Sequence, residues 1–566
     1  MAEDFISGRV CSHAFDPRFT IPGTAPQYSP DRNFQIKHVK LELDVDLKKK
    51  TVRGVCHTDM VSFGAKSLTF NAVDMKILYV KVNGKKVKYE YDTEKIVINF
   101  RKEVKYGHAL QVTVDYKLVN PKLGVYFIQP DKHYPKKPWQ AWTHSEAEDA
   151  RYWYPCMDIP ESKATTESLI TVSSDLFALS NGKLMGVHNN KKRKTKTYHW
   201  KMSSPHSPYL FMFAIGRFSE VKDKWKNVDV LYYCEKGKEE DIKRGFGKTP
   251  KMLDFFSKKI GVDYPYEKYA QVVVEDFIYG GMEHTTASTQ IDWALLDKIA
   301  AKEVWDFPQL LAAHELAHQW FGDLITCKDW SHIWLNEGFA EYFESLFAEH
   351  EDGKDMFMLE MYRKALAYFD EDTNAYRRPI VTNVYMSPND IFDRTLYQKG
   401  AWVLHMIRYI LGEELWWKAI HHYVKSNFNS SADTADLISA IRQATGFNMK
   451  KFFDQWVFKA GYPEYLVKYH WDSKKKEAQV RVIQQQQVTE ETPLFSMPVV
   501  LEFHTKNGVK TFRETADSKQ HIFNSSRTIL HRINTLAALA IKMLALFRLN
   551  TNNNMNRRRL HPILLQ

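Results

Sequence analysis

The feature that most constrains this chain is the segment His314-Glu315-Leu316-Ala317-His318. Two histidines four residues apart on a helix lie on one face, so both imidazoles can reach one metal ion. Catalytic zinc usually takes three protein ligands and leaves a fourth position for water. Glu337 is the candidate third ligand, and Glu315, beside the ion, is the candidate general base for an attacking water.

The flanking residues predict two helices. Asp306 is a candidate cap, Pro308 suits a first turn, and 309–321 contains no helix breaker before Gly322. A second helix is expected from about Leu335 to His350, with Glu337 in its first turn. Its apolar side is formed by Phe339, Phe343, Leu346 and Phe347. Glu341, one turn after Glu337, is either a hydrogen-bond partner of a metal ligand or an ordinary exposed helix glutamate.

Eighteen residues separate His318 from Glu337, which lies in a second motif, Asn336-Glu337-Gly338-Phe339-Ala340-Glu341-Tyr342. Together with His314 and His318, this motif resembles the gluzincin aminopeptidases, the family of aminopeptidase N and leukotriene epoxide hydrolase. The resemblance implies one Zn²⁺ per chain, a saddle-like β-sandwich at the N-terminal side and a thermolysin-like, mainly helical catalytic domain. It covers roughly residues 30–525.

The segment Tyr279-Gly280-Gly281-Met282-Glu283-His284 resembles the Gly-x-Met-Glu-Asn exopeptidase signature of that family. A carboxylate such as Glu283 near the metal can bind the α-ammonium of a peptide and so select its amino terminus. Glycines let backbones approach closely, so an extended substrate can pair with this segment. The predicted substrate-binding residues here are Gly280, Gly281, Met282, Glu283 and His284.

Two further segments are similar to family motifs. Residues 143–158, which include Thr143, Glu146, Arg151 and Pro155-Cys156-Met157-Asp158, match a stretch of the amino-terminal domain, and Glu146 corresponds to a second amine-binding glutamate. Tyr397-Gln398-Lys399-Gly400-Ala401 is similar to the Tyr-x-Lys-Gly-Ala motif, whose tyrosine donates to the oxyanion. A well-placed donor of this kind contributes about 2.7–4 kcal/mol to the transition state. Tyr397 is therefore predicted to be catalytic.

Two residues depart from the family pattern, since His144 and His284 stand where relatives usually carry Gln and Asn. Both lie on the amine-binding side and are assigned to substrate binding. A protonated imidazole would repel the substrate ammonium, so substrate affinity is expected to fall below about pH 6.5.

Composition fits a globular enzyme with several domain cores, since 44% of the 566 residues are hydrophobic. The net charge of +11 raises nucleic acid binding as an alternative, but basic and acidic residues are mixed through most of the chain, and no nucleic acid partner is expected. The five cysteines are scattered and odd in number, which indicates free thiols. The acidic start, Met1-Ala2-Glu3-Asp4, does not resemble a signal sequence, so a cytoplasmic location is expected.

Periodicity along the chain predicts an α+β multidomain protein. Residues 1–33 form an extended segment, and 34–219 a β domain in which Asn83-Gly84 is a hairpin turn. Apolar residues recur at helical spacing within the catalytic region 220–462, as at 401–411 and 434–444. Alternation returns in a small β module at 463–525, where Asn507-Gly508 is a second predicted turn.

Residues 526–566 are expected to form a basic, irregular tail with one apolar run, Leu536 to Phe547, as a candidate docking helix. This run is too short to cross a bilayer, so no stable membrane insertion is expected. The large helical domain that usually follows in relatives is expected to be absent, which leaves peptide length preference open.

The predicted function is a zinc aminopeptidase that removes the N-terminal residue from peptides with a free amino terminus. Two alternatives remain: an epoxide hydrolase side activity, and a non-catalytic scaffold of the same fold. The sequence leaves the side-chain preference of the first pocket and the oligomeric state open.

Overall fold

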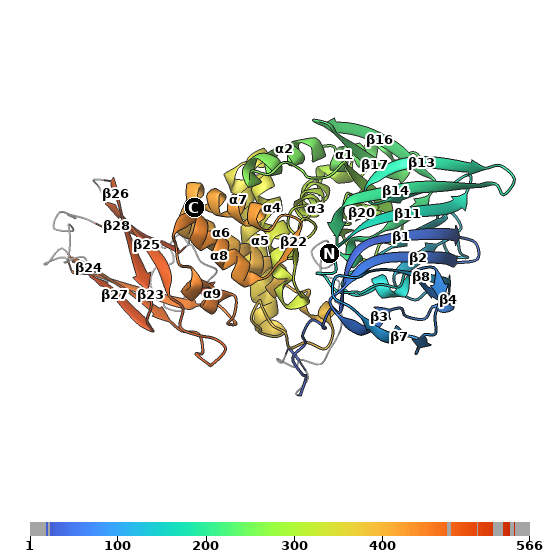
Figure 1. Ribbon diagram of the computed structural model, residues 1–566. Coiled ribbons are helices and arrows are strands. Elements are labelled where there is room, and N and C mark those ends of the chain that lie inside the picture. The colour runs from blue at the N-terminus through green and yellow to red at the C-terminus, as the bar shows by residue number, and fades with distance from the viewer. Residues whose placement is uncertain are drawn as a thin grey trace.

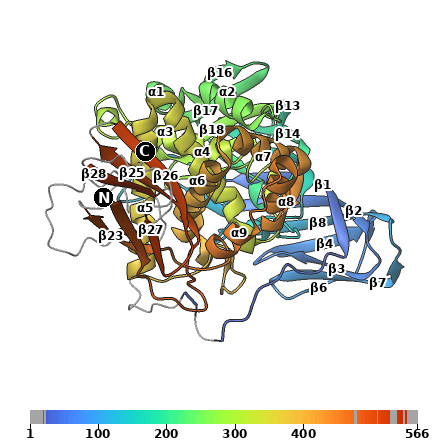
Figure 2. The ribbon, with the colours of Figure 1, turned by 90° about the vertical axis from the view of Figure 1, so that its left-hand side faces the viewer.

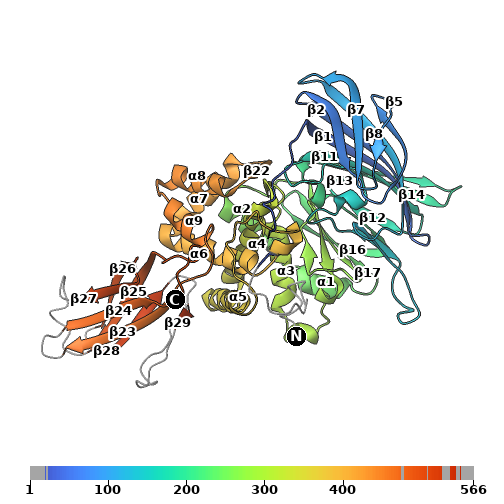
Figure 3. The same cartoon turned by 90° about the horizontal axis from the view of Figure 1, so that it is seen from below.

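The computed structural model describes residues 19–20, 23–472, 477–505, 508–524, 536–543 and 548–549. Two β-rich regions lie at opposite ends of the molecule, with a helical region between them (Figures 1 and 3). The chain passes from the larger β region through the helices to the smaller one. The fold is thus α+β, as the sequence predicted.

The N-terminal region contains three sheets, and more buried and more exposed side chains alternate along several of their strands, such as β1, β2 and β11. Its eight-stranded sheet has the order β13-β14-β11-β1-β2-β8-β4-β5, and several of these strands lie side by side in Figure 2. Their bounds are β1 Phe34–Asp46, β2 Thr51–Ser62, β4 Lys76–Val82, β5 Lys85–Lys86, β8 Ala109–Val119, β11 Ala164–Ser173, β13 Lys183–Asn190 and β14 Thr195–His206. A three-stranded sheet joins β3 Ala65–Asn71, β7 Lys95–Val104 and β6 Glu90–Tyr91. A four-stranded sheet joins β12 Phe177–Ser180, β15 Phe213–Gly216, β10 Gln140–Thr143 and β9 Val125–Ile128.

The Asn83-Gly84 turn is confirmed, because it connects β4 to β5 with Val82 opposite Lys85. Both turn residues have positive φ, 48° and 78°, which Asn and Gly tolerate better than other residues. The predicted boundary at residues 219–220 falls inside β16 Phe218–Trp225. The alternation there belongs to a hairpin with β17 Val228–Glu235, which is part of the next sheet.

That next sheet has the order β16-β17-β18-β20-β19 and supports the helical region. Its remaining strands are β18 Lys268–Val274, β19 Gly281–Met282 and β20 Ala287–Ile291. The helices are α1 Glu239–Phe246, α2 Thr249–Ile260, α3 Asp306–Ala317, α4 Trp334–Asp352, α5 Lys354–Asn374, α6 Gly400–Leu411, α7 Glu413–Ser426, α8 Thr434–Thr445 and α9 Lys450–Trp456. A parallel pair, β21 Ile325–Cys327 and β22 Ser430–Ala432, lies between α3 and α8 in sequence. The predicted helices at 401–411 and 434–444 are α6 and α8.

The small β region contains two sheets. One has the order β27-β24-β23-β29, with β23 Glu464–Asp472, β24 Glu477–Gln484, β27 Gln520–Asn524 and β29 Arg548–Leu549. The other has the order β26-β25-β28, with β25 Met497–Thr505, β26 Gly508–Ala516 and β28 Leu536–Met543. β25 and β26 form the predicted hairpin, but Asn507 of its predicted turn lies outside the described residues.

The prediction of a docking helix beginning at Leu536 is wrong. Residues 536–543 form β28, which pairs antiparallel with β25 and so belongs to the small β region. The error has a physical reason: a short apolar run has the same composition in a buried helix and in a paired strand. The remainder of the predicted tail, apart from β29, lies outside the described residues.

The structure also bears on the expected free cysteines and on the expectation of no membrane insertion. Cys56, Cys156, Cys234 and Cys327 are free, as predicted, and all four are buried, whereas Cys11 lies outside the described residues. Among the residues that the structure describes, every helix is either too short or too polar to cross a membrane.

Candidate metal centre and active site

Helix α3 carries the first motif and ends earlier than predicted. Its last residue is Ala317, and His318 follows as the C-terminal cap while its N–H still bonds to the His314 carbonyl at 3.2 Å. Asp306 is the first helical residue rather than the predicted cap, and its carboxylate accepts from Arg363 at 3.1 Å. His314 and His318 nevertheless remain one turn apart, with their ring centroids 4.8 Å apart.

Helix α4 brings the third candidate ligand opposite the histidines. Phe321, after α3, stacks on Phe339 of α4 with ring centroids 4.3 Å apart. On its other side α4 comes so close to α6 that a Cβ on Gly338 would lie 3.1 Å from the Gly400 Cα. Gly338 and Gly400 therefore permit a close contact between α4 and α6, and this contact brings Glu337 near the start of α6.

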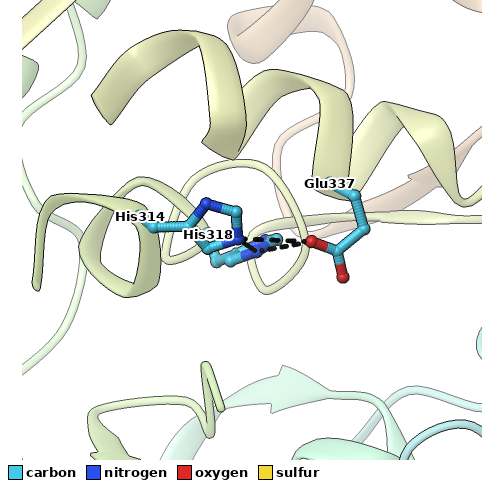
Figure 4. A group of neighbouring side chains, drawn as sticks. All are labelled: His314, His318 and Glu337. Atoms are coloured by element: carbon cyan, nitrogen blue, oxygen red, sulfur yellow. Dashed lines mark hydrogen bonds and ion pairs between the residues drawn. The ribbon is translucent and has the colours of Figure 1, made fainter. Parts of the chain in front are cut away.

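The side chains of His314, His318 and Glu337 point at one another (Figure 4). The two Nε2 atoms are 3.1 Å apart, and Glu337 Oε2 is 3.3 Å from that of His314 and 3.2 Å from that of His318. Donors held about 2.0–2.1 Å from a tetrahedral zinc ion lie about 3.3 Å from one another. The triangle therefore has the size that a single zinc ion requires.

The hydrogen bonds on the far side of each ring fix which nitrogen faces this centre. His318 Nδ1 lies 2.9 Å from the Phe321 carbonyl, and His314 Nδ1 lies 3.0 Å from Glu344 Oε2. A carbonyl or a carboxylate accepts, so each Nδ1 donates and each Nε2 presents its lone pair to the centre. Two lone pairs and a carboxylate oxygen repel one another unless a cation lies among them.

The charges around the histidines confirm that this centre attracts positive charge. Burial alone would lower the pKa of His318, but Glu283 and Glu337 outweigh it and raise that pKa to about 9. Burial would likewise raise the pKa of Glu337, but His318 and His314 hold it at about 2. The donor set therefore fits a zinc ion.

Glu315 is held beside the triad without being part of it. Its side chain is buried, Oε2 has no hydrogen-bond partner among the described residues, and burial raises its pKa to about 8. A cation bound by the neighbouring histidines would oppose this shift. Strand β19 passes so close that a Cβ on Gly281 would overlap the Glu315 carboxylate. A larger side chain at position 281 would therefore displace Glu315, and glycine avoids this clash.

Glu146 and Glu283 meet Glu337 on one side of the triad. Glu146 follows β10 and Glu283 follows β19, and an oxygen of each lies within 4.8 Å of the others and of an oxygen of Glu337. Oε1 of Glu146 and Oε1 of Glu283 are buried and have no hydrogen-bond partner in the part of the chain that the structure describes. Burial raises the pKa of both carboxyls; the charges of Glu283 and Glu337 raise that of Glu146 further, and the charge of Glu337 adds to the effect on Glu283. The structure thus brings together two predicted substrate-binding glutamates beside the triad, where their carboxylates attract a cation.

Tyr397 lies beside His314, on a π-helical turn formed by Thr395–Lys399. Its ring faces that of His314 with centroids 6.3 Å apart. Glu371 and Asp393 accept hydrogen bonds of 2.9–3.1 Å from backbone N–H groups at the start of this turn. Arg378 anchors Asp393 at 2.6 Å in turn. π-helical turns are rare in proteins, and those that occur are often found at functional sites. Here the carboxylates of Glu371 and Asp393 stabilise the turn.

His144 and His284 are buried, and their burial contradicts the expectation that their protonation lowers substrate affinity below about pH 6.5. The His144 ring packs on Phe277 and Tyr279, and burial lowers its pKa to about 3. His284 Nδ1 lies 3.0 Å from Thr289 Oγ1, and burial lowers the pKa of this histidine well below its usual value. Both rings are neutral at pH 6.5, because charging them would require an imidazolium without water. The prediction that their protonation weakens substrate binding below that pH is wrong.

Burial of His144 instead predicts an effect on stability. The folded protein cannot protonate His144 until about pH 3, whereas the unfolded chain does so below about pH 6.5, so stability falls as pH drops through this window. At pH 5.5 this difference amounts to about 1.4 kcal/mol, and at pH 7.5 it nearly vanishes. The free energy of unfolding of a His144→Gln variant, relative to the original chain, should rise by about that amount between pH 7.5 and 5.5.

Urea unfolding at the two pH values measures this shift. His188→Gln, an exposed position on β13, is the matched control and should show no such change. An equal difference between original and His144→Gln protein at both pH values would contradict the prediction.

The sequence did not single out the residue that holds His314 most closely. Glu341 was considered for this role, but its Oε2 is 3.7 Å from His314 Nδ1, whereas Glu344 Oε2 is 3.0 Å away. Both carboxylates also contact Lys364 of α5. A periodic signal existed, because Glu337, Glu341 and Glu344 follow at i, i+4 and i+7 and so share one face of α4.

Comparison with known proteins agrees with this arrangement. Residues 35–210 match the Peptidase M1 N-terminal domain, and residues 244–456 match the Peptidase family M1 domain. The chain belongs to peptidase family M1. The M1 family is the gluzincin aminopeptidase group that the motifs resembled, so that resemblance is confirmed.

Among the M1 relatives of this chain is Aminopeptidase M1 of Arabidopsis thaliana, 30% identical over 75% of this chain and 50% of the relative. Probable aminopeptidase 1 of Sulfurisphaera tokodaii is 29% identical over 77% of this chain and 54% of the relative. Leucyl aminopeptidase of Saccharolobus solfataricus is 29% identical over 76% and 54%, respectively. The chain spans about half the length of these curated relatives.

Proposed function

We propose that this M1 chain is a zinc-dependent aminopeptidase that binds one Zn²⁺ through His314, His318 and Glu337. The observation that carries the proposal is the position of Glu146 and Glu283. Each has a buried oxygen without a partner among the described residues, and a carboxylate oxygen of each lies within 4.8 Å of one of Glu337, a member of the metal triad. An endopeptidase has no need of two uncompensated buried carboxylates there, whereas the α-ammonium of a peptide amino terminus would satisfy both.

The proposed mechanism divides the chemistry among the residues described. A zinc ion held by the triad would polarise the scissile carbonyl and make water more acidic. Glu315 removes a proton from the attacking water and then delivers it to the leaving amine. Its buried, unpartnered Oε2 is free to accept that proton.

Tyr397 is proposed to donate its hydroxyl hydrogen to the oxyanion of the tetrahedral intermediate. Its ring lies next to that of His314, with centroids 6.3 Å apart. Because a donor held in place beforehand stabilises the transition state more than the ground state, this role would raise kcat.

The segment around β19 is proposed to hold the peptide backbone. β19 is the edge strand of its sheet, next to β20, so its outer side can pair with an extended peptide. Gly280, Gly281 and Met282 would contact the substrate backbone there, next to Glu283. His284 and His144 would shape the surrounding wall as neutral side chains.

A panel of dipeptides, each unblocked and amino-terminally acetylated, tests this function on protein whose zinc content has been measured. The expected result is release of free amino acid from unblocked peptides alone, lost when a chelator removes the zinc and restored when zinc returns. Cleavage of acetylated peptides, or no cleavage by zinc-loaded protein, would overturn the proposal.

We also propose that the protein acts in the cytoplasm in peptide catabolism. The support is the four buried cysteines that remain free in the structure, as expected in a reducing compartment.

A further inference from the structure

Behind the metal triad, a buried polar network joins α4, α5 and the turn that carries Tyr397. Its centre is Lys364 of α5, which is only 6% exposed. Its Nζ lies 2.8 Å from Glu341 Oε1 and 2.6 Å from Glu344 Oε1, and both carboxylates project from α4. Burial disfavours the lysine charge, but Glu341 and Glu344 outweigh this effect and raise its pKa above the usual value.

One branch of the network leads to the metal triad. Glu344 uses Oε1 for Lys364 and Oε2 for His314 Nδ1, at 3.0 Å. A carboxylate bonded at both oxygens cannot rotate freely, so Lys364 fixes the direction in which Glu344 accepts from the imidazole. That bond in turn keeps His314 Nε2 aimed at the metal position.

The other branch leads to the proposed oxyanion donor. Glu341 Oε1 accepts from Lys364 and also from Gln398 Nε2 at 2.9 Å. Gln398 directly follows Tyr397 on the π-helical turn. The same lysine therefore restrains the backbone of the residue that must place a hydroxyl against the substrate.

We propose that Lys364 is a positioning residue for both halves of the site, orienting His314 through Glu344 and fixing the turn of Tyr397 through Glu341 and Gln398. This inference rests on the proposed zinc peptidase function and adds to it. The ammonium group of Lys364 then affects both the affinity for the metal and the stabilisation of the transition state, although it contacts neither the metal position nor the substrate.

Lys364→Met tests the centre of the network. Zinc affinity, measured by competition with a chelator, is expected to fall by up to the roughly 10- to 100-fold that loss of a direct hydrogen-bond partner of a metal ligand costs, because Lys364 acts on His314 through Glu344. On protein saturated with zinc, kcat should fall while KM changes little, because the oxyanion contact forms mainly in the transition state. Lys364→Arg should restore part of both properties.

Arg408→Met is the matched control, because it also removes a largely buried cation that contacts α4. Arg408 Nη1 lies 3.0 Å from Glu349 Oε2, beyond Glu344 on the same helix, and neither residue touches the triad. Its loss should lower thermal stability with zinc affinity and kcat unchanged. If Lys364→Met resembles this control, with only stability reduced, the lysine is merely structural and the inference fails.

Single-branch variants keep the inference testable even if Lys364→Met does not fold. Glu344→Gln should lower zinc affinity, whereas Gln398→Leu should lower kcat of the zinc-saturated enzyme and leave zinc affinity intact. Equal effects of these two variants on both quantities would contradict the two-branch arrangement. Failure of the original chain to bind zinc or cleave peptides would instead overturn the proposed function, so the two failures are distinguishable.

Discussion

Replacing Glu315 by glutamine is expected to lower kcat about 10²- to 10⁴-fold without releasing the metal. The substitution keeps the size of the side chain, so it fits beneath β19, where Gly281 leaves room for a carboxylate-sized group. An amide cannot take the proton of the attacking water. Because Glu315 is not part of the triad of His314, His318 and Glu337, the affinity for zinc should stay within a few-fold of the original.

The measurement combines steady-state hydrolysis of an unblocked dipeptide with a zinc titration of the same preparation. Glu303→Gln, at an exposed position ahead of α3, serves as the control and should keep full activity. Retention of activity by zinc-loaded Glu315→Gln protein would remove Glu315 as the base. Loss of zinc together with activity would instead show that Glu315 supports the metal.

Local signals predicted the elements that carry the site, because their spacing is dictated by the backbone itself. The i, i+4 histidines required a helix, and Asn83-Gly84 required a turn with positive φ. The sequence predicted that His314, His318 and Glu337 lie together, because catalytic zinc usually takes three protein ligands and the family motif supplies the third. Helix ends were less predictable: α3 stops at Ala317 because the segment after it folds back, with the His318 side chain bonded to the Phe321 carbonyl.

What the sequence could not predict depends on contacts between elements distant in the chain. Lys364 lies 20 residues after Glu344, and no local sequence pattern indicates that its ammonium group donates a hydrogen bond to a glutamate of α4. The same holds for His144, whose titration depends on burial against Phe277 and Tyr279. Side-chain type indicated which residues could act, whereas their protonation states required the packed structure.

Replacing Glu283 by glutamine is expected to lower kcat/KM for unblocked dipeptides about 30- to 5,000-fold, the equivalent of about 2–5 kcal/mol for one partner of a buried charge pair. Glu283 is 2% exposed, and its Oε1 has no other partner among the described residues. The substrate ammonium gives up its water on entering, so the glutamate charge must compensate it. A neutral amide oxygen does so only in part.

A pair of metal-binding inhibitors measures the contact between Glu283 and the ammonium group separately from the hydrolysis step. An unblocked amino acid hydroxamate and its amino-terminally acetylated form can both ligate the zinc, but only the first carries an ammonium group. Glu283→Gln should weaken inhibition by the unblocked compound and leave the acetylated one nearly unchanged. Glu148→Gln is the matched control: it belongs to the same acidic segment as Glu146, but its carboxylate pairs with Arg151 at 2.9 Å and is one third exposed. Equal weakening of both inhibitors by Glu283→Gln would mean that this residue supports the metal site rather than the amino terminus, and exopeptidase selection would then have to rest on Glu146 alone.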